Sequence, residues 1–197
     1  MKKIIAILIF ILLSSCHKKD HDLAFEKNVM NEIFTDLVDA IYTDMRTVKI
    51  PSRPFLAKGT YDKLKSHQIA LAEREKRIIK IKNDTSRIVL AIYDTITKIT
   101  NRTAYNIDLS KLNKSNTYIF KYWSDFPKGR KIWNTKYPFY FGGIISFSRI
   151  EFDWSKKSGV LTAGISYADQ DAQGFDIYIK KSNNKWIIEK VVETWIS

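Results

Sequence analysis

The chain contains little cysteine and histidine, and it has no long apolar run. Its 197 residues include one cysteine and three histidines. A single cysteine excludes an internal disulfide and any metal site with two cysteine ligands. The longest apolar run, residues 4–13, has ten residues, whereas a transmembrane helix needs about 18 or more. The fold must therefore be stabilised by its hydrophobic core.

The first fifteen residues have the three zones of a secretory signal peptide. Lys2 and Lys3 precede the apolar run, and the small residues Ser14 and Ser15 follow it, which is the order that export signals share. Ten helical residues span about 15 Å, half of a hydrocarbon core. We therefore predict a cleaved signal peptide over residues 1–15.

The segment Leu13-Ser14-Ser15-Cys16 resembles the lipobox of bacterial lipoproteins. The resemblance implies cleavage before Cys16, a diacylglyceryl thioether on its sulfur and an acyl group on the new amine. Two or three chains would anchor the protein firmly, because each buried methylene contributes about 0.8 kcal/mol. Cys16 is thus the predicted lipidation site, and residues 16–22 are a predicted polar tether. The predicted location is the bacterial cell envelope, with the outer membrane favoured and the periplasmic or surface face left open.

Bases outnumber acids, with 33 Lys and Arg against 21 Asp and Glu and a net charge of +12. Without Lys2 and Lys3 the charge is 12 − 2, or +10. A basic surface favours anionic partners, which in an envelope are lipid head groups, lipopolysaccharide phosphates and acidic glycans. Nucleic acid is not expected there. A generally lysine-rich proteome explains the same charge without any partner.

Two helices are predicted near the N-terminus. Apolar residues recur at helical spacing from Leu23 to about Thr47, which indicates an amphipathic helix. Pro51 and Pro54 end it. Thr60 can cap a second helix over residues 61–82.

Strand patterns follow. Residues 87–93 form a short apolar, β-branched run typical of a buried strand. Four further segments are separated by turn compositions, which predicts an antiparallel meander: residues 147–152, 160–167, 175–179 and 186–195. We predict one α+β domain over residues 23–197, with the two helices packed on one curved antiparallel sheet of five or six strands.

The last fifty residues, with their "KWII…W" ending, resemble small Bacteroidota lipoproteins and NTF2-like or cystatin-like α+β folds. The resemblance implies helices on a curved sheet, which in NTF2-like domains often encloses a pocket. It brings no catalytic motif, and fold alone does not establish a ligand.

Lysines and aromatic residues alternate along residues 111–141. Aromatic faces can stack on sugar rings while cations hold phosphates or carboxylates. The alternative is that these rings complete the core. The candidate ligand-binding residues are Tyr118, Tyr122, Trp123, Lys128, Arg130 and Trp133.

Catalytic patterns are scarce. The chain has no glycine-rich phosphate loop, HExxH or GxSxG motif, so we predict no catalytic residue, metal or cofactor. Asp169, Asp171 and Asp176 could surround calcium, but a polar hairpin turn explains them better. His67 reads as an exposed helix residue.

The leading hypothesis is therefore a lipid-anchored binding or envelope-structural module for an acidic glycan or lipopolysaccharide. The alternative is a periplasmic or surface hydrolase that uses carboxylates in an NTF2-like pocket. A module that binds another envelope protein, unidentified by the sequence, is a third hypothesis. Acidic residues that could serve the hydrolase are Glu151, Asp153, Glu189 and Glu193.

Overall fold

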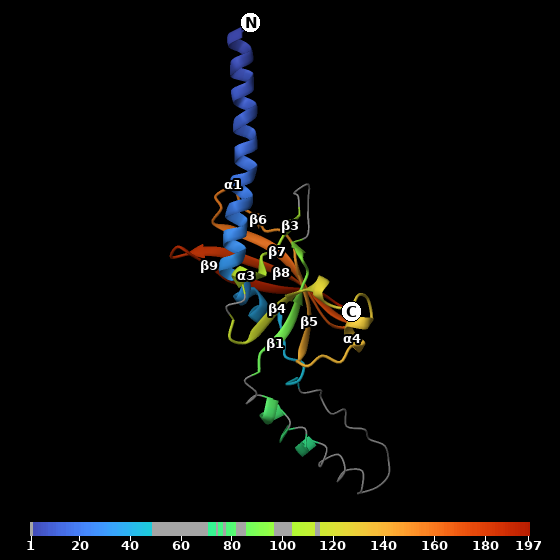
Figure 1. Cartoon of the computed structure of the whole chain (residues 1–197). Helices are drawn as coiled ribbons and strands as arrows, with labels where there is room; N and C mark the ends of the chain where they lie inside the picture. The colour runs from blue at the N-terminus through green and yellow to red at the C-terminus, as the bar shows by residue number, and fades with distance from the viewer. Residues whose placement is uncertain are drawn as a thin grey trace.

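The computed structural model describes residues 2–48, 71–73, 75–76, 78–81, 86–96, 104–112 and 115–197, with the side chains of the first range described from Asp22 onward. It shows a mixed α+β fold with one large sheet (Figure 1). The helices are α1 (Lys2–Ile41), α3 (Leu109–Leu112), η1 (Trp123–Asp125) and α4 (Lys131–Asn134). The strands are β1 (Ile88–Ile92), β2 (Thr95–Ile96), β3 (Tyr105–Asn106), β4 (Tyr118–Tyr122), β5 (Phe141–Phe147), β6 (Glu151–Phe152), β7 (Ser158–Ala168), β8 (Asp171–Ser182) and β9 (Lys185–Ile196).

The large sheet has seven strands in the order β4-β1-β5-β7-β8-β9, with β6 paired to β7. The strands from β5 to β9 are antiparallel, as the short polar turns between them predict. β1, however, is parallel to both β4 and β5. The predicted sheet of five or six antiparallel strands is therefore wrong at this end. Parallel neighbours need long crossover connections, and residues 93–117 and 123–140 provide them.

α1 packs one stripe of its surface on the sheet. The stripe includes Val29, Ile33 and Leu37, each at most 2% exposed, at the spacing that brings side chains to one helix face. The centroid of the Phe34 ring lies 5.0 Å from that of Phe120 and 5.4 Å from that of Phe147. These residues form the main core.

The predicted N-terminal helix is thus present, but with different ends. α1 ends at Ile41 and includes residues 16–22, for which the sequence predicts a tether. Of the second predicted helix, residues 71–73, 75–76 and 78–81 are helical, and the remainder lies outside the described residues. Where the structure describes the chain, it contains no helix long and apolar enough to cross a membrane.

A buried ion pair fastens α1 to the connection between β5 and β6. Arg149 donates from Nε to Glu26 Oε1 (2.6 Å) and from Nη2 to Glu26 Oε2 (2.5 Å), and the Ile150 N–H donates to Oε1 (3.0 Å). Glu26 is 1% exposed and Arg149 7%. The hydrogen bond to Glu26 raises the pKa of Arg149, so the guanidinium keeps its positive charge.

The two faces of the sheet are covered differently. At β1, α1 covers one face, while Phe126 and Ile132 pack on Val89 and Ala91 of the other face. We call this second packing unit, formed by residues 123–141 over β1, the aromatic lid. Over β7, β8 and β9 the outer face carries exposed residues of the described chain, among them Tyr178, Ile187 and Trp195.

Candidate functional site

The six candidate residues from the aromatic stretch do not form one surface. Tyr118 is 6% exposed and belongs to the main core. Its hydroxyl donates to Asp39 Oδ1 on α1 (2.8 Å), and burial together with this carboxylate raises its pKa. Tyr122 packs against the same core, and its hydroxyl donates to the Ile107 carbonyl (3.1 Å). Both tyrosines therefore serve the packing of α1 and the residues before β4.

Trp123 and Trp133 lie in the aromatic lid, on the other side of the sheet. Trp123 stacks on Tyr93 with ring centroids 4.8 Å apart and an interplanar angle of 10°. Trp133 packs on Phe141 with ring centroids 5.6 Å apart. Both tryptophans are half-buried, so much of their surface already contributes to packing over β1.

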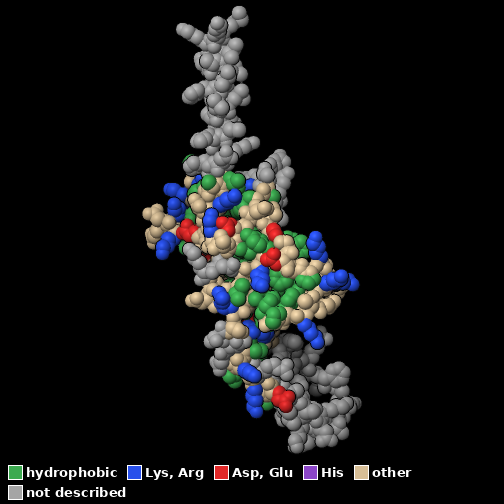
Figure 2. Space-filling view, viewed as in Figure 1, with side chains coloured by type: hydrophobic (Ala, Val, Ile, Leu, Met, Phe, Trp, Pro, Cys, Tyr) green, Lys and Arg blue, Asp and Glu red, His purple; other side chains and the backbone are tan. Residues whose placement is uncertain are grey.

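The two cationic candidates lie at the turn before α4. Lys128 is exposed, and Arg130 donates from Nε to Asp169 Oδ2 at 2.8 Å. Figure 2 shows hydrophobic side chains grouped over the part of the domain where β5 and α4 lie, with Lys and Arg at their margin. The structure thus brings Trp123, Trp133 and this cationic turn to one side of the sheet and places Tyr118 and Tyr122 on the other.

The predicted hairpin is present at Asp169, where β7 and β8 pair on either side of the turn, but Asp171 and Asp176 lie within β8. In this turn, Asp169 forms an ion pair with Arg130 from the turn before α4. Across the ranges that the structure describes, no three His, Cys, Asp or Glu side chains are grouped as a metal ion would require. His67 lies outside the described residues.

Two of the carboxylates considered for hydrolysis have local partners. Asp153 accepts hydrogen bonds from Ser155 Oγ (2.6 Å) and the Lys157 N–H (2.9 Å) in the turn between β6 and β7. The hydrogen bond from the Ser155 hydroxyl lowers the pKa of Asp153 most, and the backbone hydrogen bonds lower it further. Glu189 accepts from Lys180 Nζ at 2.7 Å on the outer face of the sheet. Asp153 therefore stabilises a surface turn, and Glu189 forms a surface ion pair between two neighbouring strands.

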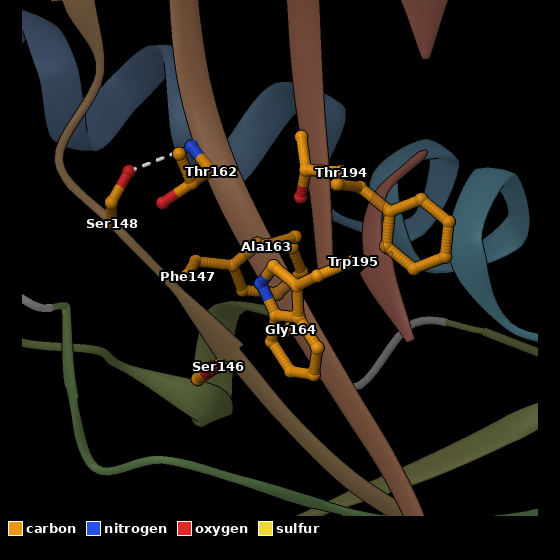
Figure 3. A pocket seen from close by; sticks show the side chains of 9 residues that line it. Ser146, Phe147, Ser148, Thr162, Ala163, Gly164, Thr194 and Trp195 are labelled. Atoms are coloured by element: carbon orange, nitrogen blue, oxygen red, sulfur yellow. Dashed lines mark hydrogen bonds between the residues drawn. The ribbon is translucent and has the colours of Figure 1, made fainter. Parts of the chain in front are cut away.

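A pocket of about 260 Å³ lies on the outer face, beside Trp195 near the end of β9 (Figure 3). Its position follows from one row of paired residues across four strands: Ser146 pairs with Gly164, Gly164 with Gly174, and Gly174 with Trp195. Gly164 forms part of the pocket floor, because it has no side chain, and Gly174 lies beneath the Trp195 indole. The indole of Trp195 rises at one side, 52% exposed.

Gly174 is required for this arrangement. A Cβ atom at Gly174 would lie 2.0 Å from Trp195 Nε1, far closer than two non-bonded atoms approach. The indole can therefore rest against β8 only where the facing residue has no side chain. At Gly164 a Cβ would lie 3.1 Å from Ser146 Oγ, so this glycine also keeps the floor open.

Hydroxyl groups supply the polar part of the pocket. Ser148 Oγ donates to the Arg149 carbonyl (3.0 Å) and accepts from the Thr162 N–H (2.8 Å), which fixes the strand edges next to the cavity. None of the lining residues is titratable in the physiological range. They are Ser146, Phe147, Ser148, Thr162, Ala163, Gly164, Phe175, Thr194 and Trp195.

This combination suits a small neutral ring that has an apolar face and polar edges. An indole offers a flat apolar surface for stacking, and serine and threonine hydroxyls both donate and accept hydrogen bonds. Sequence reasoning missed the site because it lies outside the aromatic stretch. The available signal was a tryptophan in an alternating strand and a glycine in the preceding one, but their pairing depends on the register between β8 and β9.

Comparison of the chain with protein-family models, with curated proteins and with solved structures found no match.

Proposed function

We propose that this protein is an exported, lipid-anchored binding module of a bacterial cell envelope, and that the Trp195 pocket holds one sugar ring of an envelope glycan. The observation that carries the proposal is the row Ser146-Gly164-Gly174-Trp195, which sets an exposed indole beside a hydroxyl-lined floor. A sugar ring matches it, because its C–H face can stack on the indole while its hydroxyls bond to serine and threonine.

Two features favour binding to a glycan that is also anionic, such as lipopolysaccharide or an acidic polysaccharide. The mature chain carries a net charge of 12 − 2, or +10, which attracts polyanions at long range. The contact between Arg130 and Asp169 also brings the cationic turn before α4 to the hairpin that supplies Gly164 and Gly174. The pocket would then hold a neutral ring, and the cations of the turn before α4 would attract charged groups elsewhere on the same glycan.

The same lining favours binding over the hydrolase alternative. Glycoside hydrolysis in most families uses two carboxyl groups that flank the bond to be cleaved. The residues that line the pocket include no carboxylate and no histidine. A bound sugar would therefore meet hydroxyl groups and an indole, which hold a ring but neither protonate a leaving group nor activate water efficiently.

The ligand proposal is tested by titrating the full chain, in detergent, with lipopolysaccharide and with the lipid-free polysaccharide prepared from it. Trp195→Ala should weaken binding of the lipid-free polysaccharide about tenfold, which corresponds to about 1.4 kcal/mol. Trp154→Ala is the matched control, because Trp154 is 97% exposed and outside the pocket. Equal affinity for both variants and the parent would refute the site. Release of reducing ends during the titration would favour the hydrolase.

The anchor is tested separately, by growth with labelled palmitate followed by membrane fractionation. The parent should incorporate label and sediment with membranes, whereas Cys16→Ala should lose the label and be released. Retention of label by Cys16→Ala would refute lipidation at this residue. Surface protease treatment of intact cells then distinguishes the surface face from the periplasmic face.

We further propose that residues 61–82 form a second helix on a curved sheet, in the manner of NTF2-like or cystatin-like folds. In support, Ile78 is 7% exposed whereas its neighbour Ile79 is 59% exposed, as expected for a helix with one buried face. Ile78→Asp should therefore lower the melting temperature and Ile79→Asp should not. Equal effects of the two substitutions would contradict a packed helix.

A further inference from the structure

β9 is an edge strand of unusual length. It is the last strand in the sheet order and has twelve residues. Within the part of the chain that the structure describes, β8 is its only strand partner. At its start, the Trp186 N–H donates to Glu32 Oε1 of α1 (2.9 Å). The edge that follows offers backbone groups on which another strand can pair.

A bulge in β9 determines which side chains share a face. Ile188 and Val191 both pack against the main core, although they are three residues apart, because the register shifts between Tyr178 and Ile179. Tyr178 pairs with Lys190 and Ile179 with Ile188. Glu189 is therefore the additional residue of the bulge, with no partner of its own on β8. Its carboxylate binds Lys180, which pairs with Ile187 on the outer face. Glu189 and Lys190 therefore both lie on the outer face.

The sequence around this bulge is self-complementary. The six residues 187–192 read Ile-Ile-Glu-Lys-Val-Val. When two copies run antiparallel about the point between Glu189 and Lys190, each Glu189 meets a Lys190. Ile188 then meets Val191 on the core face, and Ile187 meets Val192 on the outer face.

We propose that β9 pairs with β9 of a second copy of this chain in this register, to give a two-fold symmetric dimer with a sheet continuous through both copies. Opposite charges and apolar side chains that face each other across a strand pair are stabilising. A register shifted by one residue in either direction would place Glu189 opposite Glu189 or Lys190 opposite Lys190, which is unfavourable. Charges on an edge strand usually prevent pairing, but here they select one partner and one alignment.

The test uses charge reversal on the full chain in detergent, with the dissociation constant of the dimer measured by sedimentation equilibrium. Glu189→Lys and Lys190→Glu should each raise this constant by about tenfold or more, because each dimer contains the contact twice. The double variant Glu189→Lys/Lys190→Glu should restore dimerisation, because the opposite charges again face each other. Failure of the double variant to restore it would overturn the proposal.

A further control separates folding from pairing. Glu189→Lys also removes the ion pair with Lys180, whereas Lys180→Gln removes that pair and leaves both edge charges in place. Lys180→Gln should therefore dimerise like the parent. A parent chain that is monomeric at every concentration, or that pairs through this edge with a different protein, would overturn the proposal.

The register is tested by disulfide formation after mixing Glu189→Cys chains with Lys190→Cys chains under mild oxidation. The mixed pair should cross-link faster than either variant alone, since residues 189 and 190 are directly opposed only between unlike chains. The parent, with Cys16 as its only cysteine, gives the background. Cross-linking of the mixed pair at the background rate would overturn the proposed alignment.

Discussion

The buried ion pair between Glu26 and Arg149 makes a strong prediction about stability. Glu26→Gln keeps an oxygen acceptor for the Ile150 N–H and nearly the same volume, but it leaves the Arg149 guanidinium buried without the carboxylate. Breaking a buried pair in this way costs about 3–5 kcal/mol. For a domain of this size, about 2–4 °C of melting temperature corresponds to each kcal/mol. We therefore expect a fall of roughly 10 °C.

Two further variants show whether the stranded charge of Arg149 causes the loss of stability. Glu26→Met/Arg149→Met removes both charges and should recover most of the lost stability, because apolar residues of similar volume often replace a buried pair at little cost. Lys180→Gln breaks its pair with Glu189, whose two side chains are 45% and 48% exposed, and should cost at most about 1 kcal/mol. Thermal unfolding followed by circular dichroism measures all three variants. A double variant as unstable as Glu26→Gln would show that lost shape, and not the stranded charge, causes the effect.

Three further predictions concern the pocket, the core and one turn. Gly174→Ala should displace the Trp195 indole, and so change the near-ultraviolet circular dichroism and weaken polysaccharide binding as Trp195→Ala does. The melting temperature should change little, because the ring is on the surface. Unchanged binding would contradict the role of Gly174 in seating the indole. Phe34→Ala should lower the free energy of unfolding, measured in urea, by about 3–5 kcal/mol, because Phe34 is 1% exposed. A loss below about 1 kcal/mol would contradict its place in the core. The pKa of Asp153 lies below its ordinary 3.8 in the folded chain, so its contribution is present above that pH and is lost as the pH falls through the lowered value. Asp153→Asn should therefore be less stable than the parent at neutral pH, and the difference should vanish at strongly acidic pH.

The C-terminal meander could be predicted from the sequence because its signals are local. Predicted strands 160–167, 175–179 and 186–195 lie within β7, β8 and β9. Alternating side chains and turn residues identify such strands without knowledge of their partners. The helical stripe from Val29 to Ile41 was predicted for the same reason, because its spacing is a property of the segment itself.

The rest depended on pairings between distant segments. The parallel pairing of β1 with β4 joins residues 88–92 to 118–122, and no local pattern specifies it. That pairing directs Tyr118 to the core under α1 and its neighbour Ile119 to the aromatic lid. The predicted strand 147–152 is instead the end of β5 followed by β6, with Arg149 between them. Likewise, Trp195 forms a pocket wall only because the register places it opposite Gly174.

The continuity of α1 has a mechanical consequence for the proposed anchor. Cys16 and Glu26 are ten residues apart within one helix, a separation of about 15 Å. A lipid at Cys16 would therefore be joined to the core by a stiff rod that ends in the Glu26–Arg149 clamp. Force applied at the membrane would reach the sheet directly, and the helix would limit how far the domain can tilt or turn above the bilayer.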